Sequence, residues 1–132
     1  MCWTPLVPTG MAAPAAPYSL GAKSAEGGWV FTAGLVAIDT NGATVGVGNI
    51  REQTRHVLEQ IRSIVEAAGG AVSDVLSVQI FIKDFADYAA MNEVYREFFL
   101  SAGGSFPPRY CIRADLVKND WLVEMAAVAK VG

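Results

Sequence analysis

The sequence contains few charged residues and no long apolar run, and these two absences limit the kind of protein it encodes. Of its 132 residues, 17% are charged and 52% are hydrophobic, whereas about a quarter are charged in an average soluble domain. No stretch reaches the ~18–20 apolar residues needed to span a bilayer. We expect one domain over residues 1–132, whose surplus apolar side chains are covered by further copies of the chain in a homo-oligomer.

Cysteine, histidine and basic residues are scarce as well, which argues against several classes of site. The two cysteines, Cys2 and Cys111, stand far apart, have no metal-ligand spacing and make no disulfide framework. The net charge of −3 and the isoelectric point of about 5.0 are unlike those of nucleic-acid-binding domains. The chain also lacks a phosphate-binding loop, a metal-ligand cluster and a dinucleotide fingerprint. We therefore expect no metal, no cofactor and no nucleic-acid partner.

The N-terminal segment lacks the pattern of a secretion signal. Its first basic residue is Lys23, and prolines interrupt every apolar stretch of the first 17 residues. A signal peptide instead begins with basic residues and continues with an unbroken apolar region. Residues 1–16 are expected to form an extended arm. The expected location is the cytoplasm, with no membrane partner.

Hydrophobic periodicity predicts an α+β fold. β-Branched and aromatic runs bounded by turn residues predict the strands. They are expected at residues 29–33, 43–47, 75–82, 109–113 and 121–129, the second of them being a short return strand. Two helices separate the later strands. This order predicts a two-layer domain in which both helices cover one face of a mixed sheet.

The helices are expected between Asn49 and Gly69 and between Asp87 and Gly103. Asn49 stands three residues before Glu52, which is the spacing of a helix-capping box. Helical or alternating periodicity selects the side chains that face the core. They are Val57, Ile61, Ile64, Val65, Ala68, Leu76, Val78, Ile80, Ile82, Tyr88, Met91, Tyr95 and Phe98.

The fourth expected strand carries two arginines on one face. Alternation places Arg109, Cys111 and Arg113 together, and the preceding Pro107-Pro108 holds Arg109 stiffly at the start of the strand. A guanidinium in this position is suited to bind a carboxylate. The residues alone leave a second interpretation open, in which Arg109 is an exposed edge residue or half of a structural ion pair. Cys111 is expected to be a small buried side chain rather than a nucleophile.

The last expected strand contains a single carboxylate, Glu124, with apolar residues on both of its faces. Such a group must find a partner or shift its pKa upward. Glu124 is therefore either a base or water-orienting group, or one half of a buried ion pair. His56, the only histidine, is expected to be a solvated helix residue. Tyr18 follows the prolines and is expected to act as an anchor or a lid.

Short motifs follow one another along the chain from Ala13 to Val128. They are Ala16-Pro17-Tyr18, Thr32-Ala33-Gly34, Ile64–Gly70, Phe81–Asp84, Met91–Tyr95, Phe98-Phe99, Pro107–Cys111 and Val123–Met125. In this order and spacing they resemble the RidA/YjgF family of small imine and enamine deaminases. Within that family the chain is most similar to the RutC branch, proposed to deaminate 3-aminoacrylate. The stretches that carry the branch resemblance are Gln53–Glu59, Tyr88–Glu93 and Leu116–Lys118.

The resemblance implies a chorismate-mutase-like α+β domain, assembled as a homotrimer with three sites in the clefts between subunits. It implies that Arg109 binds the substrate carboxylate, that Glu124 holds the attacking water and that Tyr18 closes the pocket. Further polar contacts are implied from the backbone of Gly34 and Cys111 and from Asn92.

The implied activity is cofactor-free hydrolytic deamination of a small carboxylate-bearing enamine or imine, such as 3-aminoacrylate or 2-aminoacrylate. Arg113 lies four residues beyond Arg109 on the same face, about 13 Å along the strand, so it either binds a second carboxylate, as in 2-aminomuconate, or pairs with Asp115 or Glu124. Many family members have serine where this chain has Ala33. That difference leaves open a third hypothesis, a non-catalytic trimeric ligand-binding or regulatory protein. A nuclease role, reported for some relatives, fits poorly with the acidic isoelectric point.

Overall fold

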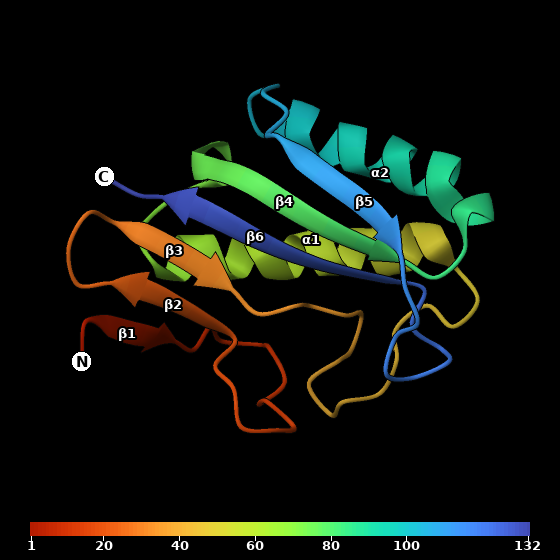
Figure 1. The fold of residues 1–132 in the computed structure, drawn as a ribbon, viewed down its shortest axis with the longest axis horizontal. Coiled ribbons are helices and arrows are strands. Elements are labelled where there is room, and N and C mark those ends of the chain that lie inside the picture. The colour runs from red at the N-terminus through yellow and green to blue at the C-terminus, as the bar shows by residue number, and fades with distance from the viewer.

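The structure is a computed structural model that describes residues 1–132, and its framework is a six-stranded sheet (Figure 1). The strands are β1 (Trp3–Leu6), β2 (Gly21–Ser24), β3 (Trp29–Thr32), β4 (Val75–Ile82), β5 (Arg109–Arg113) and β6 (Val123–Lys130). The helices are α1 (Ile50–Ala67) and α2 (Tyr88–Ser101), and the short 3-10 turns Val72–Asp74 and Phe85–Asp87 precede β4 and α2. The predicted α+β class is confirmed.

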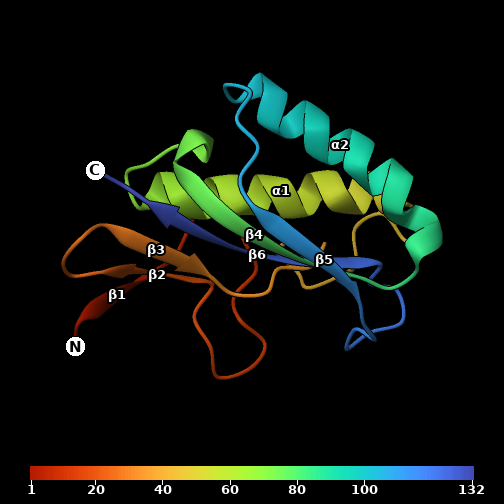
Figure 2. The same ribbon diagram turned by 45° about the horizontal axis from the view of Figure 1, so that its top comes forward.

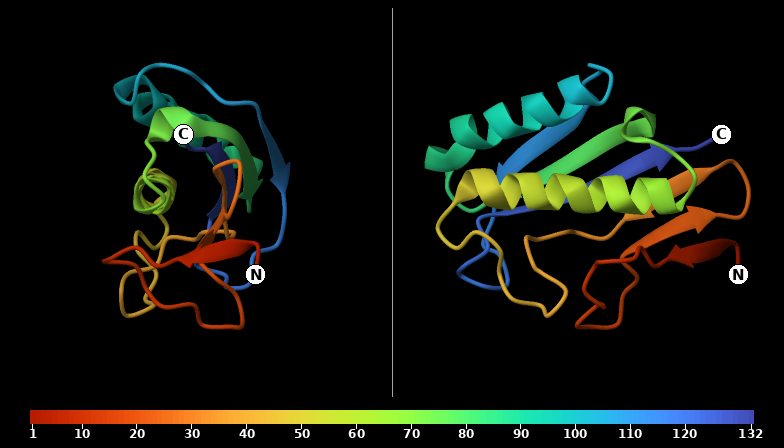
Figure 3. Two further views of the ribbon diagram at one scale, coloured as in Figure 1. Left: turned by 90° about the vertical axis from the view of Figure 1, so that its left-hand side faces the viewer. Right: turned by 180° about the vertical axis from the view of Figure 1, so that it is seen from behind.

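The sheet is mixed, as predicted. Its strand order is β1-β2-β3-β6-β4-β5, and β4 and β5 form its one parallel pair. A parallel pair requires a crossover connection, which α2 supplies. Seen end-on, the sheet and α1 form two layers (Figure 3), and α2 lies beside α1 towards the β5 edge (Figure 2). The opposite face of the sheet carries no helix, and neither helix has the length and apolar composition that crossing a membrane requires.

Helix α1 begins and ends where the sequence predicts. The Asn49 side chain accepts a hydrogen bond of 3.1 Å from the backbone N–H of Glu52, which satisfies a donor that the first turn leaves free. Gly69, with a φ of +89°, follows the last turn, where the left-handed conformation favours glycine. The apolar stripe between these residues packs against the sheet. Its fully buried members include Val57, Leu58, Ile61, Ile64 and Val65.

A polar side chain of α1 fixes the entry into β6. Gln53 is fully buried, and its amide donates to the carbonyl oxygens of Gly46 at 3.1 Å and Asp120 at 2.8 Å. Its own carbonyl accepts from the backbone N–H of Leu122 at 2.9 Å. All of these bonds satisfy polar atoms that burial would otherwise leave unpaired. Gln53 therefore holds the loop before β6 against the helix.

His56 was expected to be solvated, and that expectation is wrong. The ring is half-buried, and its Nε2 lies 2.8 Å from the carbonyl oxygen of Ile38, so this nitrogen carries the proton and donates it. One turn further on, Gln60 donates to the carbonyl oxygen of Val36 at 2.8 Å. The two bonds hold the irregular segment after β3 against α1.

Two segments before α1 have a different secondary structure from the one that the sequence predicts. Residues 43–47 form no strand, since the only pairing there is a bridge between Ile38 and Thr44. Within the segment expected to be an arm, residues 3–6 form β1, antiparallel to β2. Pro5 is tolerated in β1 because an edge strand does not need every N–H for the ladder.

Two residues expected in the core are exposed instead. In β4 the pairing is irregular between Val75 and Ser77, and such a bulge shifts the alternation of side chains. Val75 is therefore buried while Leu76 is 45% exposed. Tyr88, in the first turn of α2, is 40% exposed, because it lies beside the arginine of β5 rather than under the sheet.

Candidate active site

Arg109 is the first residue of β5, and its side chain lies on the helix-covered face of the sheet. It stands opposite the fully buried Val78 of β4, and opposite residues of a ladder share a face. The guanidinium lies 4.6 Å from the centroid of the Tyr95 ring of α2. Its Nη2 donates to Asn92 Oδ1 at 2.6 Å and to the Tyr88 hydroxyl at 3.3 Å. Helix α2 therefore positions this arginine.

Arg109 has no charged partner. The ion pairs within the protomer are Arg51–Glu93 and Arg62–Glu59, so Arg109 is not half of an ion pair within one chain. A partly buried cation that no protein charge neutralises attracts an anion strongly, because water screens it less than at an open surface. The planar fork of a guanidinium matches a carboxylate. The surroundings of Arg109 therefore fit a carboxylate site.

Cys111 and Arg113 share the face of Arg109, as the alternation predicted, since they stand opposite the buried Ile80 and Ile82. Burial raises the pKa of the Cys111 thiol, and the charge of Arg109 lowers it in part. The thiol thus stays protonated at neutral pH, which suits a polar contact better than a nucleophile. Arg113 is exposed and is paired with neither Asp115 nor Glu124.

Glu124 lies on the other, helix-free face of the sheet. It stands opposite Phe81 in the pairing of β6 with β4, is half-buried and has no ion-pair or hydrogen-bond partner within the protomer. Burial raises the pKa of its carboxyl group. Of the two outcomes expected for a lone carboxylate in an apolar strand, an ion pair is absent from the protomer, and burial without a partner favours the upward pKa shift. A carboxyl group with a raised pKa exchanges protons more readily near neutral pH.

Gly34 provides the space that the Glu124 side chain occupies. Reciprocal backbone hydrogen bonds of 2.8 and 3.0 Å between Leu35 and Met125 hold the two segments side by side. A Cβ at position 34 would stand 2.5 Å from Glu124 Oε2 and 3.0 Å from its Cδ. Any side chain at position 34 would therefore displace the carboxylate.

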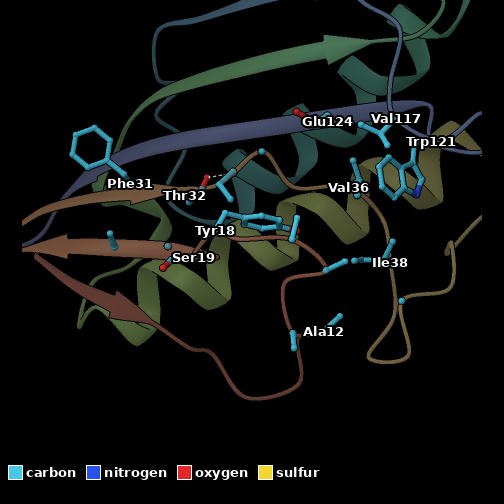
Figure 4. A pocket seen from close by; sticks show the side chains of 18 of the residues that line it. Ala12, Tyr18, Ser19, Phe31, Thr32, Val36, Ile38, Val117, Trp121 and Glu124 are labelled. Carbon is cyan, nitrogen blue, oxygen red and sulfur yellow. Dashed lines mark hydrogen bonds between the residues drawn. The ribbon is translucent and has the colours of Figure 1, made fainter.

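Glu124 and Gly34 line a hollow of about 1260 Å³ together with Tyr18 (Figure 4). The Tyr18 ring, which is 48% exposed, lies across the middle of the hollow in Figure 4, between Thr32 and Ile38. Most of the lining is apolar. The family resemblance implies that Tyr18, Gly34 and Glu124 line one pocket, and the structure brings these three together.

Two further residues define the chemistry of the hollow. Ala33 offers no hydroxyl, and the neighbouring Thr32 hydroxyl is already engaged, donating to the Ala33 carbonyl at 2.7 Å and accepting from the Ala127 N–H at 2.9 Å. Trp121 also lines the hollow, and its indole N–H is buried without a protein partner. The sequence predicts a strand from residue 121, whereas β6 begins at Val123, so Trp121 lies in the loop before the strand and its place beside the hollow was not predicted.

Arg109 and Glu124 do not meet within one protomer. Glu124 shares its face with Phe81, whereas Arg109 shares the opposite face with Val78. Two strand spacings and three residues along the strand put their Cα atoms roughly 14 Å apart. The protomer thus carries two separate clusters, one of Arg109 with its α2 partners and one of Glu124 with the hollow.

Sequence reasoning assigned Tyr88 and Tyr95 to the core and missed their contact with Arg109. The available signal was the spacing of Tyr88, Asn92 and Tyr95 at i, i+4 and i+7, which places all three on one face of a helix. Asn92 had been expected near the cleft, and the structure places it in direct contact with Arg109.

Comparison with known proteins gives consistent matches along nearly the full chain. A family model described as endoribonuclease L-PSP matches residues 9–131. TdcF of E. coli, solved with bound serine, is 29% identical over 98% of this chain and 99% of its own, with a TM-score of 0.88. The YjgF gene product of E. coli is 27% identical over 96% and 98%, with a TM-score of 0.86. YyfA of Yersinia pestis, a Rid-family protein of unknown function, is 25% identical over 98% and 99%, with a TM-score of 0.87.

Proposed function

The chain belongs to the RidA/YjgF family, whose sequence model is described as endoribonuclease L-PSP, and we propose that it hydrolytically deaminates small enamines or imines that carry a carboxylate. The expected substrates are of the 3-aminoacrylate or 2-aminoacrylate type, the former in keeping with the RutC-like motifs. One observation carries the proposal: the partly buried guanidinium of Arg109 has only neutral partners. The raised pKa of Glu124 supports it.

The proposed catalytic unit is a homotrimer with its sites in the clefts between subunits. Arg109 and Glu124 lie on opposite faces of the sheet, so a site that uses both needs Arg109 from one copy and Glu124 from another. The helix-free face around Glu124 is also unusually apolar for a surface. Its exposed aromatic and aliphatic side chains are Trp29, Phe31, Tyr110 and Ile112. Packing against a second copy would cover them.

The reaction needs positioning and proton transfer rather than a strong nucleophile. The enamine gains a proton on carbon and loses one from nitrogen, which gives the imine. Water then adds across the C=N bond, a proton moves to nitrogen, the C–N bond breaks, and ammonia leaves a carbonyl acid. One water is consumed for each ammonia released. Arg109 holds the carboxylate and so fixes the reacting carbon, an effect that is large for otherwise bimolecular steps.

Glu124 supplies the proton transfer. Its ionised form accepts a proton from the attacking water, and its protonated form returns one to the departing nitrogen. Because burial raises its pKa, both forms are accessible closer to neutral pH than for a solvated glutamate, which is the condition for efficient acid–base catalysis. Tyr18, across the hollow from Glu124, covers the substrate.

A second substrate class has its own support. Arg113 is exposed, shares the face of Arg109 and pairs with no carboxylate. It therefore has a free charge for the second carboxylate of a dicarboxylate such as 2-aminomuconate. The name of the family model, endoribonuclease L-PSP, suggests RNA cleavage instead, but a net charge of −3 gives little attraction for a phosphate backbone.

The first test is turnover. Enamines and imines are generated enzymatically in the presence of semicarbazide, which traps whatever the protein does not hydrolyse. Arg109→Ala is expected to abolish deamination while the melting temperature stays near that of the wild type. Arg96→Ala, which removes an exposed arginine of α2, is the matched control and is expected to keep full activity. Near-normal turnover by Arg109→Ala would refute the proposal.

The second test is complementation between two inactive variants. Arg109→Ala still carries Glu124, and Glu124→Gln still carries Arg109, so a site between subunits is restored wherever the two intact halves face each other. Random 1:1 assembly restores about a quarter of the sites of a cyclic oligomer. A site built within one protomer gives no recovery at all. Failure of complementation would therefore reject the intersubunit arrangement, even if each single variant is inactive.

A further inference from the structure

The residues that hold Arg109 all come from one stripe of α2. Tyr88, Asn92 and Tyr95 follow one another at i, i+4 and i+7, and each contacts the guanidinium: Asn92 by a hydrogen bond of 2.6 Å, Tyr88 by one of 3.3 Å, and Tyr95 through its ring face at 4.6 Å. We call these three residues the α2 cradle. A flexible arginine side chain is thereby fixed at its head as well as at its backbone.

The α2 cradle is uncharged throughout. Asn92 accepts as a neutral amide, and burial raises the pKa of Tyr95 to about 12, against a partial lowering by Arg109, so its hydroxyl stays protonated. Only Nη2 donates to the protein. A guanidinium has five N–H donors, so Nε and Nη1 keep three of them for another acceptor. Both the charge and most of the fork remain unused.

Helix propensity does not favour asparagine at position 92. Asparagine is a poor helix former, because its side chain competes for the backbone, and position 92 lies inside α2. An aspartate would hold the guanidinium more tightly, since charge-assisted hydrogen bonds are about twice as strong as neutral ones. It would also neutralise the cation. The neutral amide gives up holding strength and keeps the positive charge available.

We propose that Asn92 is a specificity-determining positioning residue: with Tyr88 and Tyr95 it orients Arg109 while leaving the guanidinium charge to select an anionic, carboxylate-bearing ligand. The inference rests on the proposed function only in that the ligand carries a carboxylate. It assigns to Asn92 an action through Arg109, and to the ring of Tyr95 the support of the guanidinium plane.

The test is Asn92→Asp, which keeps the shape and the acceptor oxygen but adds a negative charge beside Arg109. The probe is pyruvate, whose dissociation constant is measured by calorimetry on the intact assembly, with uncharged pyruvamide as the control ligand. Asn92→Asp is expected to weaken pyruvate binding roughly 10–100-fold, the loss of charged hydrogen bonds, and to leave the weak binding of pyruvamide unchanged. On a small enamine, KM rises more than kcat falls.

Tyr95 offers a second variant pair that does not alter charge. Tyr95→Phe keeps the ring under the guanidinium and is expected to keep wild-type pyruvate affinity, since the Tyr95 hydroxyl has no hydrogen-bond partner. Tyr95→Leu removes the ring and is expected to weaken pyruvate binding severalfold, by loss of a cation–π contact. Melting temperatures of all variants establish that each is folded.

The outcomes separate the two proposals. Pyruvate affinity within twofold of wild type in folded Asn92→Asp would overturn the inference, and so would a wild-type protein that binds pyruvate no better than pyruvamide. If pyruvate binding follows the expected order but no enamine is hydrolysed by the wild type, the deaminase proposal fails and the role of the α2 cradle stands. Normal turnover together with unaltered binding in Asn92→Asp leaves the deaminase and removes the cradle.

Discussion

Gly34→Ala is expected to separate the placement of Glu124 from the stability of the fold. The backbone at Gly34 is outside the left-handed region, so alanine fits its conformation. The Cβ would stand 2.5 Å from Glu124 Oε2, and no ordinary contact allows that distance. Because the obstacle is the free end of a flexible side chain, the carboxylate moves and the backbone stays.

The size of the movement follows from the geometry. Ordinary contact begins at 3.4 Å, so Oε2 must retreat by 3.4 − 2.5 = 0.9 Å. A misplacement of about 1 Å costs on the order of 100-fold in rate. Stability changes little: alanine gains about 0.4–1 kcal/mol through the unfolded chain, and a strained Glu124 rotamer costs about 0.5–1.5 kcal/mol. The net change lies within roughly 1 kcal/mol of zero.

The assay is kcat and KM on an enzyme-generated enamine, with pyruvate affinity and the melting temperature measured in parallel. Gly34→Ala is expected to lower kcat about 100-fold, with pyruvate affinity within about threefold, because Arg109 is untouched. The control is the same substitution in the Glu124→Gln background. There the proton-transfer group is already lost, and alanine at position 34 is expected to cost little more.

Two results would refute this reasoning. If Gly34→Ala retains kcat within about threefold of wild type, the position of the Glu124 carboxylate does not limit the reaction. If the losses from Gly34→Ala and Glu124→Gln multiply in the double variant, Gly34 acts on the substrate directly, since residues that work through one another give non-additive effects.

Two more changes test the site from other sides. Glu124→Gln is expected to raise the melting temperature at pH 7 and to leave it unchanged below about pH 4. The pKa of the Glu124 carboxyl is raised on folding, so the wild type loses stability as the pH rises from the ordinary carboxyl pKa through the raised one. Equal melting shifts at both pH values would contradict a raised pKa as the cause. Arg113→Ala is expected to lower kcat/KM roughly tenfold or more for a dicarboxylate enamine and to leave a monocarboxylate unaffected; equal losses for both would remove Arg113 from substrate selection.

The sequence predicted the fold where local chemistry determines it. The Asn49 cap, the apolar stripe of α1 and the first and last residues of β5 all follow from spacing and residue type, and the structure agrees. The failures occur where a tertiary contact decides. His56 is held by a carbonyl of the segment after β3, and Leu76 is moved outward by the bulge in β4. The carbonyl that holds His56 belongs to Ile38, and the strand that pairs with the bulge is β6, so both contacts join segments that are distant in the sequence.

The candidate site shows the same division. Alternation correctly grouped Arg109 with Cys111. For Glu124 the apolar pattern left two outcomes open, an ion-pair partner or a raised pKa, and could not decide between them. The relation between the two strands was not predictable, because it depends on the strand order β6-β4-β5 and on the parallel pairing of the last two. Periodicity gives the face of a residue relative to its own strand alone.

The composition of strand β6 bears on why the two candidate groups lie on opposite faces of the sheet. Residues on both of its faces are apolar, so the pattern did not say which face meets the helices; in the structure the face of Met125 is buried and the face of Glu124 is the open one. An open face needs no apolar side chains unless something covers it. A second copy that covers this face and brings its own Arg109 towards Glu124 would account for both the composition of β6 and the separation of the two clusters. On this argument the apolar character of β6 and the split site have one cause, and disrupting the assembly is expected to abolish activity without changing either cluster.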